Sequence, residues 1–358
     1  MENNFKEFYK NLVTAQSPAG FEYAGQKAYY DFVKQYADTI QADINGNVTA
    51  TKNGKSDFSI MIAGHGDEIG FMVNYIDSDG YVYVKVIGGL DVSILPGLRL
   101  SIIHGDQIVR AIIGKKAAHM VKASDKAPSK IEDLWLYIGA KDKEEAEKRV
   151  SIGDPVTFSA GYEELTDDIV VSKAADNKTG VFVAGLIQYY LSQLDEPVLA
   201  TVHSVSTVCE ESNGKGAYTA AETLKPTIGI AVDVTFATDH PGVDKKIWGE
   251  VKLGGGPVIG MGSSLNPKVW KLLIETAKEN DIPYQLSVDT NRTGTDADSF
   301  FKLNGGIATS VVSIPNRYMH SPNEVISLSD LENTAKLIFE FIKKIEVDID
   351  LYPFHFDK

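Results

Sequence analysis

Two adjacent glutamates, Glu210 and Glu211, end an apolar run and are the first residues of this chain whose types and spacing indicate chemistry. Consecutive residues leaving a strand point to opposite sides, so two neighbouring carboxylates can take two different tasks. We expect Glu211 to bind a metal ion and Glu210 to transfer a proton.

Four other residues of metal-binding type lie on separate segments. His65, Asp233 and His320 each follow a strand-like run, whereas Asp176 precedes a predicted helix, where a carboxylate is held near the helix start. In open α/β sheets, the loops beyond the carboxyl ends of the strands converge on one crevice. We therefore expect all four to meet the paired glutamates there.

This set of side chains matches the demands of a two-metal hydrolytic centre. Two divalent ions about 3.5–4 Å apart need one bridging carboxylate and roughly two further protein ligands each. Asp176 can bridge the ions. His65 and Asp233 then complete one ion, while Glu211 and His320 complete the other. Three carboxylates against two dications leave a formal charge of +1, which favours a hydroxide that bridges the metals.

The two remaining polar residues have supporting roles in this hypothesis. Asp67, two residues beyond His65, can accept the imidazole N–H that faces away from the metal. Glu210, which has no metal to bind, can act as general base toward the water and as general acid toward a leaving amine. Histidine and carboxylate ligands accept several metals, and we expect zinc or cobalt, with manganese as a third candidate.

The elements that must hold these residues alternate between helix and strand in the first and last parts of the chain. Predicted helices cover residues 4–13, 22–36, 179–194, 216–224 and 267–280, with a last helix opened by a Ser329-x-x-Glu332 capping box, and predicted strands cover 58–63, 199–208, 227–234 and 307–314. Alternation of this kind predicts an α/β fold with a mixed, largely parallel sheet flanked by helices.

The stretch between residues 70 and 162 has a different pattern. Short apolar or alternating runs at 71–75, 81–87, 99–103 and 108–113 are separated by glycine-containing turns. We therefore predict a small β-barrel or sandwich over residues 70–162, inserted into a discontinuous catalytic domain formed by residues 1–69 and 163–358.

Composition restricts the class of partner. The 358 residues are 43% apolar and carry a net charge of −14 without a basic run, which argues against nucleic acid or an anionic membrane as main partner. No uncharged stretch approaches the ~20 residues needed to span a bilayer. The single cysteine, Cys209, excludes an internal disulfide and fits a reducing compartment, so we expect a cytoplasmic protein.

Five motifs occur in a characteristic order along the chain. They are His65-Gly66-Asp67-Glu68, Ala175-Asp176-Asn177-Lys178-Thr179-Gly180, Thr207-Val208-Cys209-Glu210-Glu211, Ala231-Val232-Asp233-Val234 and Met319-His320-Ser321-Pro322. Together they resemble the motif series of the M42 family of aminopeptidases, the tetrahedral and glutamyl aminopeptidases. The resemblance runs from Ser17-Pro18 to the C-terminal helix, and the order and spacing of the motifs make it specific.

The resemblance implies a zinc-peptidase-like fold that removes N-terminal residues from short peptides, with the metal and base roles given above. It also implies that the inserted β-domain serves dimerisation and that dimers often assemble into a hollow tetrahedral dodecamer. Two segments, 253–257 and 294–297, resemble those that line the substrate cleft of the family.

This chain departs from the family pattern at three places. Asn177-Lys178 stands where the family commonly has Asp-Arg, Ser212-Asn213 replaces Val-Gly, and Cys209 replaces a frequent Gln. These departures leave substrate orientation open. Lys252 and Arg292 are candidate partners for an acidic substrate side chain, although most such residues are simply exposed to solvent.

Two other functions stay open on sequence grounds. The chain can be a non-catalytic peptide-binding or scaffold homologue, or Glu210 and Glu211 can be the acid pair of a glycoside hydrolase, whose carboxyl groups lie ~5–9.5 Å apart. Taken singly, each candidate ligand also has an ordinary structural interpretation: Asp176 as a helix cap, Asp233 as a strand end, and each histidine as a core residue.

Overall fold

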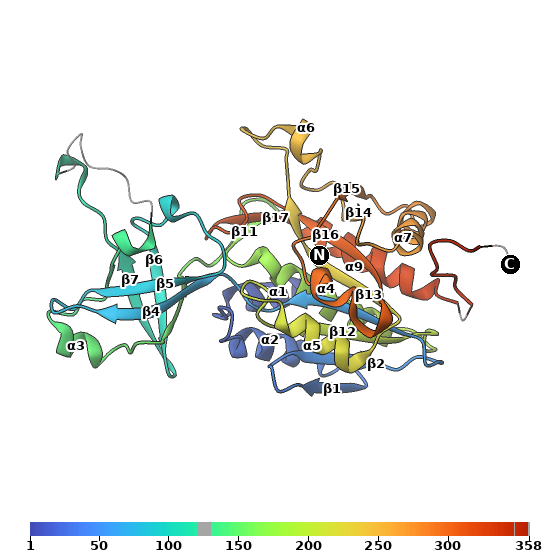
Figure 1. The fold of residues 1–358 in the computed structure, drawn as a ribbon, viewed down its shortest axis with the longest axis horizontal. Helices are drawn as coiled ribbons and strands as arrows, with labels where there is room; N and C mark the ends of the chain where they lie inside the picture. Colours follow the sequence, from blue (N-terminus) through green and yellow to red (C-terminus); the bar gives the residue numbers. More distant parts are fainter. Residues whose placement is uncertain (121–129, 347, 357–358) are drawn as a thin grey trace.

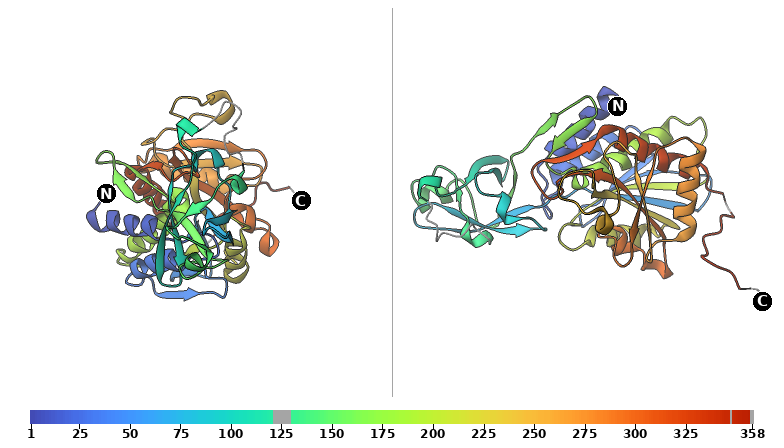
Figure 2. Two further views of the ribbon diagram at one scale, coloured as in Figure 1. Left: turned by 90° about the vertical axis from the view of Figure 1, so that its left-hand side faces the viewer. Right: turned by 90° about the horizontal axis from the view of Figure 1, so that it is seen from above.

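The protein consists of an α/β body and a β-barrel that stands away from it (Figures 1 and 2). The structure is a computed structural model and describes residues 1–120, 130–346 and 348–356. The predicted fold class is confirmed, because a mixed sheet with flanking helices is accompanied by a closed barrel.

An eight-stranded sheet forms the centre of the body, in the order β1-β2-β12-β3-β13-β16-β14-β15. Its strands are β1 (Thr39–Ala42), β2 (Val48–Lys52), β3 (Ser59–His65), β12 (Thr201–Thr207), β13 (Ile228–Phe236), β14 (Val258–Gly262), β15 (Gln285–Asp289) and β16 (Ala308–Asn316). The middle strands β12, β3, β13 and β16 are parallel. Strand β2 runs antiparallel to β1 and β12, whereas β14 runs antiparallel to β16 and parallel to β15. The carboxyl ends of four strands therefore share one edge of the sheet.

Helices cover both faces of this sheet. One face carries α1 (Asn3–Thr14), α2 (Tyr23–Val33), α4 (Ala175–Ser192), α7 (Pro267–Glu279) and α9 (Leu328–Lys343), and the other carries α5 (Lys215–Leu224), α8 (Ala297–Phe300) and the 3₁₀ turn η4 (Leu303–Gly305). Helix α4 packs very close to β3, because a Cβ added at Gly64 would lie 2.4 Å from the backbone of Gly180. A Cβ added at Gly180 would lie 2.3 Å from the Val232 carbonyl oxygen, so both positions need glycine. The close contact holds the start of α4 against the end of β3.

The barrel is closed, in the strand order β4-β5-β8-β7-β6-β9. Its elements are β4 (Gly70–Ile76), β5 (Val82–Ile87), β6 (Arg99–His104), β7 (Gln107–Ile113), β8 (Leu136–Tyr137), β9 (Pro155–Phe158), the helix α3 (Lys143–Glu147), and the 3₁₀ turns η1 (Val92–Ile94), η2 (Ala118–Met120) and η3 (Ile131–Asp133). Phe71, Leu100, Ile102 and Phe158 fill a core separate from that of the body. Of the two predicted architectures for this segment, the barrel is the one observed.

A small sheet and a buried ion pair join the two parts. Strands β10 (Tyr162–Glu164), β11 (Ile169–Ser172) and β17 (Glu324–Ser327) form the sheet, in which Ser172 lies opposite Glu324. The chain leaves the body after β3 and returns before α4. At these crossings, the Lys173 Nζ lies 2.6 Å and 2.7 Å from the two carboxylate oxygens of Glu68. Both side chains are buried, so the pair fixes the outgoing segment to the returning one.

One predicted helix start is wrong. Helix α9 begins at Leu328, and the hydroxyl of Ser327 accepts the Asp330 N–H at 3.3 Å, so Ser327 and not Ser329 is the N-cap. The Ser329 N–H donates instead to Asp168 at 2.8 Å. Helix α6 (Lys245–Trp248) lies on a segment that projects from the body beyond β14 and β15 (Figure 1). In the described ranges, no helix combines the length and apolar character that a membrane span requires.

Candidate metal centre

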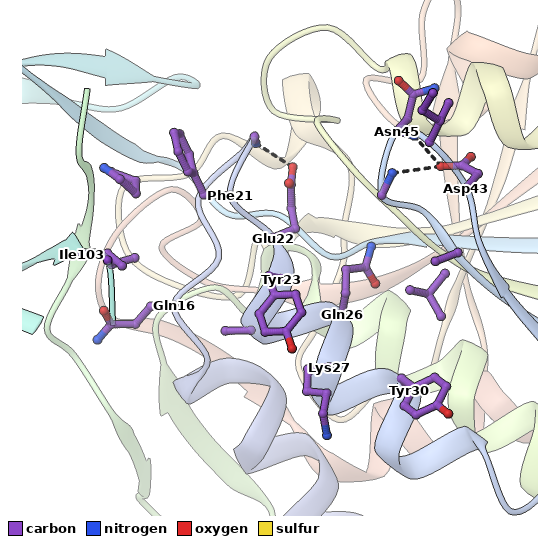
Figure 3. A pocket seen from close by; sticks show the side chains of 18 residues that line it. Gln16, Phe21, Glu22, Tyr23, Gln26, Lys27, Tyr30, Asp43, Asn45 and Ile103 are labelled. Atoms are coloured by element: carbon purple, nitrogen blue, oxygen red, sulfur yellow. Dashed lines mark hydrogen bonds between the residues drawn. The ribbon is translucent and has the colours of Figure 1, made fainter. Parts of the chain in front are cut away.

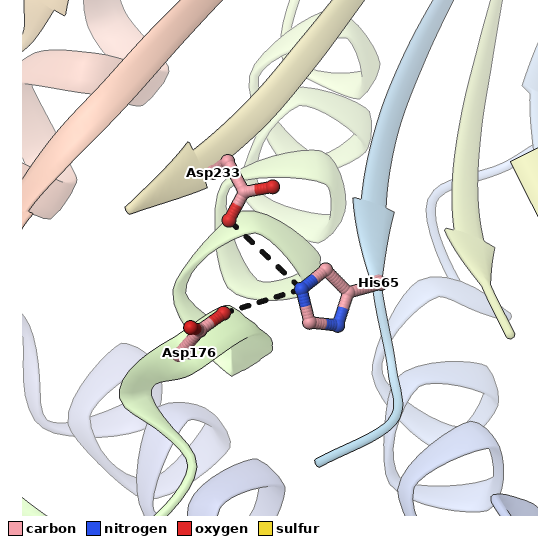
Figure 4. A group of neighbouring side chains, drawn as sticks. All are labelled: His65, Asp176 and Asp233. Atoms are coloured by element: carbon pink, nitrogen blue, oxygen red, sulfur yellow. Dashed lines mark ion pairs between the residues drawn. The ribbon is translucent and has the colours of Figure 1, made fainter. Parts of the chain in front are cut away.

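Three of the predicted ligands form a tight group at the carboxyl edge of the sheet. His65 ends β3, Asp233 lies on β13, and Asp176 lies near the start of α4 (Figure 4). The His65 Nε2 is 3.2 Å from Asp176 Oδ1 and 3.9 Å from Asp233 Oδ1. All three side chains are buried, and one donor atom from each lies within 4.8 Å of the others.

A second group shares one member with the first. The His320 Nε2 lies 3.2 Å from Asp176 Oδ2 and 3.6 Å from Glu211 Oε1. These three residues also place one donor atom each within 4.8 Å of one another. Because one oxygen of Asp176 faces His65 and the other faces His320, this carboxylate has the geometry of a bridge between two cations.

The paired glutamates do not separate by strand alternation as expected. Strand β12 ends at Thr207, Cys209 adopts a positive φ of 57°, and the glutamates lie in the turn that follows. Their carboxyl groups nevertheless reach different places. Glu211 faces His320, whereas the Glu210 Oε2 lies 3.8 Å from the His65 Nε2. The turn, and not the pleat of a strand, directs them apart.

Asp67 holds this turn. Its Oδ1 accepts the Glu210 N–H and its Oδ2 accepts the Glu211 N–H, both at 3.1 Å. The predicted contact with His65 is weaker: the imidazole Nδ1 lies 3.3 Å from the Asp67 carbonyl oxygen and 3.5 Å from its carboxylate. Asp67 is therefore placed to orient the paired glutamates and the imidazole together.

Glu324 is an important residue that the sequence pattern did not reveal. Its side chain is buried on β17, where one oxygen accepts the Asp176 N–H and the other accepts the His320 N–H, both at 2.8 Å. One carboxylate thus positions the backbone of two candidate ligands. The sequence carries no signal for this role, since Glu324 follows a turn-like Ser-Pro-Asn segment typical of an exposed loop.

Asn177 and Lys178, which depart from the family pattern, both have buried structural contacts. The amide of Asn177 donates to the Val232 carbonyl at 2.8 Å and accepts the Gly180 N–H at 2.9 Å. An aspartate could not make the first bond when charged. The ammonium of Lys178 contacts the Ser17 hydroxyl and the Gly66 carbonyl, and burial lowers its pKa to about 8. Both side chains thus contact backbone adjacent to Asp233 and His65.

The carboxylates and the imidazole of the centre shift one another's pKa values. Burial and the Asp176 carboxylate raise the pKa of Glu211 well above its usual range, and burial does the same for Asp233. Burial acts to lower the pKa of His65, but its hydrogen bonds to Asp176 and Asp67 outweigh this and raise it. Burial above all raises the pKa of Glu210 to about 7. Protonation thus offsets the negative charge of a cluster whose described members include no lysine or arginine.

A divalent cation fits this donor set. The Glu211 Oε1 is buried and makes no hydrogen bond to any described residue, since the His320 Nε2 at 3.6 Å lies beyond hydrogen-bonding distance. Oxygen and imidazole donors converge from three sides without a lysine or arginine among them. Two such groups, joined by Asp176, match the coordination demands of a pair of divalent ions.

A further buried carboxylate, that of Asp296, lies close to Glu210. The Asp296 Oδ2 accepts the Thr207 hydroxyl at 2.5 Å, while its Oδ1 has no hydrogen-bond partner among the described residues. Burial raises the pKa of Asp296 to about 6. Asp296 lies in segment 294–297, one of the two predicted to line a substrate cleft.

Two cavities lie near the centre, with different linings. One, of about 560 Å³, is lined by Gly294 and Thr295 but by no residue of segment 253–257. Asp330 accepts the N–H groups of Gly254 and Gly256 in that segment. The other, of about 760 Å³, lies between α2, the β1–β2 turn and the barrel (Figure 3). Figure 3 shows Phe21, Tyr23 and Tyr30 along it, and none of the candidate ligands lines it.

The other described histidines lie outside the centre. His104 contacts Asp154, His203 contacts Thr51, His240 contacts the Pro241 carbonyl and His355 contacts Asp350, whereas His119 lies on η2 of the barrel segment. Lys252 is exposed and pairs with Glu250 at 3.3 Å. Arg292 is 86% exposed at 3.7 Å from Asp298. Neither Lys252 nor Arg292 lines the cavity beside the centre.

Comparison with protein families gives a match over most of the chain. The sequence model of the family described as M42 glutamyl aminopeptidase matches residues 46–337. A protein of Acetivibrio thermocellus is 38% identical over 95% of this chain and 99% of its own length. The lysyl aminopeptidase of Pyrococcus furiosus is 32% identical over 95% of this chain and 97% of its own length.

Solved structures with the same fold include a TET aminopeptidase from a marine sediment thaumarchaeon, with a TM-score of 0.92 and 30% identity over 97% of this chain and 98% of that one. A TET1 peptidase of Pyrococcus horikoshii, described as assembling into a tetrahedron or a large octahedral shell, has a TM-score of 0.85 and 27% identity over 95% and 100%. A Thermotoga maritima structure described as an endoglucanase has a TM-score of 0.76 and 30% identity over 94% and 96%.

Proposed function

The chain belongs to the M42 glutamyl aminopeptidase family and is thus a peptide hydrolase, and from this premise we propose that it removes N-terminal residues from short peptides at a two-metal centre. His65 and Asp233 would hold one ion, Glu211 and His320 would hold the other, and Asp176 would contribute one oxygen to each. The observation that carries this proposal is the division of the Asp176 carboxylate, with one oxygen 3.2 Å from each imidazole.

When bound by these residues, two divalent ions would supply Lewis acidity for an attacking water and for the carbonyl of the scissile bond. Glu210 accepts a proton from that water and delivers it to the leaving amine as the C–N bond breaks. Its position supports the role, because its Oε2 lies 3.8 Å from the His65 imidazole while the carboxylate belongs to neither ligand group. Asp67 orients Glu210 by accepting its backbone N–H.

Self-association through the barrel is part of the same proposal. The strand neighbours Ile112 on β7 and Tyr137 on β8 point outward and are about half exposed, and Ile108 on the same face of β7 is exposed as well. Neighbouring apolar side chains such as Ile112 and Tyr137 on the outside of a barrel favour contact with another protein surface. We assign residues 70–162 to dimerisation, with residues 1–69 and 163–358 as the catalytic domain, and propose a dimer that assembles further into a tetrahedral dodecamer.

A cytoplasmic location completes the proposal. Cys209 is free and buried, which fits a compartment that keeps thiols reduced.

One experiment tests the reaction class and the metal requirement together. Purified protein is stripped with a chelator, reloaded separately with zinc, cobalt or manganese, and assayed against a panel of aminoacyl anilides and N-blocked controls. We expect turnover of free N-termini only, lost on chelation and restored by at least one metal. Hydrolysis of N-blocked substrates, or turnover that survives exhaustive chelation, would contradict the proposal.

Two alternatives correspond to defined outcomes of the same experiment. Absence of turnover over the whole panel with two metals bound per chain would indicate a peptide-binding or scaffold protein. Activity on a β-glucan that persists after chelation would indicate a glycoside hydrolase that uses Glu210 and Glu211. The second alternative leaves the two buried histidine–carboxylate groups without a function, so the peptidase is the better explanation.

A further inference from the structure

Glu22, at the start of α2, contacts the turn that carries the paired glutamates. Its Oε1 accepts the Cys209 N–H at 3.1 Å and the Cys209 thiol at 3.3 Å, across 187 residues of sequence. Both side chains are buried. Cys209 directly precedes Glu210, so Glu22 holds the backbone one residue before the proposed base.

Four consecutive backbone N–H groups, from residue 208 to residue 211, donate to side chains from the N-terminal part of the chain. The acceptors are Asn47 for the first, Glu22 for the second and Asp67 for the last two. A buried N–H that loses its acceptor destabilises the conformation that buries it. The conformation of this turn therefore depends on three side chains that are distant in sequence.

The backbone conformation of Cys209 adds to this dependence. Cys209 has a φ of 57°, in the left-handed region that is unfavourable for a residue with a Cβ atom. Such a conformation persists where the surrounding contacts determine it. The bonds to Glu22 are contacts of this kind, because they hold both the N–H and the side chain of the strained residue.

Three hydrogen bonds converge on one oxygen of Glu22. In addition to the two groups of Cys209, its Oε1 accepts the Gly20 N–H at 2.7 Å. Glu22 also lines the cavity of about 760 Å³ between α2 and the barrel (Figure 3). A glutamine at this position can therefore keep an oxygen on the three donors while its NH₂ group faces the open space.

We propose that Glu22 is a positioning residue of the reaction, which sets the direction of Glu210 by holding Cys209 in its left-handed conformation. The inference rests on the role of Glu210 proposed above. Glu22 belongs to neither ligand group and acts through the backbone of the turn. A displacement of about 1 Å in a catalytic group can lower a rate about 100-fold, so a small movement of the turn is sufficient.

The first test separates the reach of Glu22 from its charge. Glu22→Ala removes both, Glu22→Asp keeps the charge on a shorter side chain, and Glu22→Gln keeps the reach without the charge. With metal-loaded protein, Glu22→Ala and Glu22→Asp should each lower kcat on the best aminoacyl anilide about 10–100-fold at nearly unchanged KM, because a base acts in the chemical step. Glu22→Gln should stay within about threefold of the wild type, since its amide oxygen accepts the same donors.

A matched substitution controls for the loss of a glutamate. Glu7 is exposed on α1, so Glu7→Ala should be fully active. Wild-type kcat in both Glu22→Ala and Glu22→Asp, a loss that appears only in KM, or a loss that Glu22→Gln does not restore would overturn the inference.

A double variant shows whether Glu22 acts through Glu210. Residues that act as a unit have non-additive effects, so Glu22→Ala should change the residual rate of Glu210→Gln by less than about twofold. A further loss as large as the loss that Glu22→Ala causes in the wild type would show that Glu22 acts independently of Glu210, and would overturn the inference.

Hydrogen exchange separates this inference from the proposed function, because exchange does not depend on turnover. The amides of residues 208–211 should exchange at least about tenfold faster in Glu22→Ala than in the wild type or in Glu22→Gln. If no anilide is hydrolysed but exchange follows this order, the hold of Glu22 on the turn is confirmed and the aminopeptidase proposal fails. If anilides are hydrolysed and Glu22→Ala changes neither exchange nor kcat, the aminopeptidase proposal stands and the positioning role fails.

Discussion

The carboxylate of Glu324 accepts the backbone N–H of Asp176 at 2.8 Å. Its other oxygen accepts the N–H of His320, so a single buried side chain fixes the backbone at the proposed bridging residue and at a proposed ligand of the second ion. Burial and the nearby Asp176 carboxylate raise the pKa of Glu324 well above its usual range. Glu324 therefore positions two candidate ligands although it belongs to neither ligand group.

Glu324→Gln should weaken metal binding without unfolding the protein. The amide keeps one acceptor oxygen, so one of the two backbone N–H groups loses its partner and a ligand is held less firmly. Changes in groups that orient ligands typically cost 10–100-fold in metal affinity, and we expect a loss in that range by competition with a chelating indicator. Glu279→Gln, an exposed member of a surface pair with Lys344, should bind metal as the wild type does; equal affinity in the two variants would contradict the role of Glu324.

Glu210→Gln should abolish turnover and leave metal binding intact. The variant side chain cannot accept the proton of water, and general acid–base groups contribute about 10²–10⁴-fold to rate. The measurement is kcat on the best anilide together with metal content of the purified variant. Glu222→Gln, on the exposed side of α5, is the matched control and should be fully active. Turnover in Glu210→Gln within tenfold of the wild type would remove Glu210 from the role of base.

Asp176 and His320 should differ in how many ions they affect. Because the oxygens of Asp176 face both imidazoles, Asp176→Asn should weaken both sites, whereas His320→Gln should weaken one and leave the His65–Asp233 site able to bind. Calorimetric titration with zinc measures the number of tight sites, and we expect two in the wild type, one in His320→Gln and none in Asp176→Asn. One tight site in Asp176→Asn would contradict the bridge.

Asp330 should make stability depend on pH in the acidic range. Burial raises its pKa to about 6 from 3.8, and the carboxylate accepts N–H groups from Gly254 and Gly256 at 2.8 Å and 2.7 Å. Because the folded state holds the proton more tightly, this group's stabilising contribution is complete below pH 4 and is lost as pH rises to about 6. At ~1.4 kcal/mol per pKa unit, the change is on the order of 2–3 kcal/mol.

Asp330→Asn should remove that dependence, since an amide does not titrate. It also replaces one acceptor oxygen by an NH₂ group, which lowers stability by about 1 kcal/mol at every pH. The measurement is the free energy of unfolding in denaturant between pH 4 and 7. Subtracting the variant from the wild type cancels groups common to both, and a difference that stays constant across this range would contradict the prediction. For the control Asp57→Asn, at an exposed residue just before β3, the free energy of unfolding should vary with pH as it does in the wild type.

The ligand positions could be proposed from sequence because the fold repeats one rule. His65 ends β3, Asp233 lies in the last half of β13, and His320 follows β16. These three strands are neighbours and parallel, so their carboxyl ends meet at one edge of the sheet. Asp176 follows the same logic, since the close contact of α4 with β3 brings its helix start to that edge.

Other features depended on contacts that no local pattern contains. The directions of Glu210 and Glu211 follow from a turn held by Asp67, a residue far away in the chain, and not from the period of a strand. Helix α9 begins at Leu328 and not after Ser329, because the Ser329 N–H donates to Asp168.

The ion pair of Glu68 and Lys173 has a mechanical consequence. The polypeptide enters the barrel shortly after His65 and re-enters the body shortly before Asp176, so any force on the barrel is transmitted along these two stretches. The buried pair ties them to each other on the body side of the barrel. A displacement of the barrel is therefore resisted at this ion pair, between the barrel and the positions of His65 and Asp176.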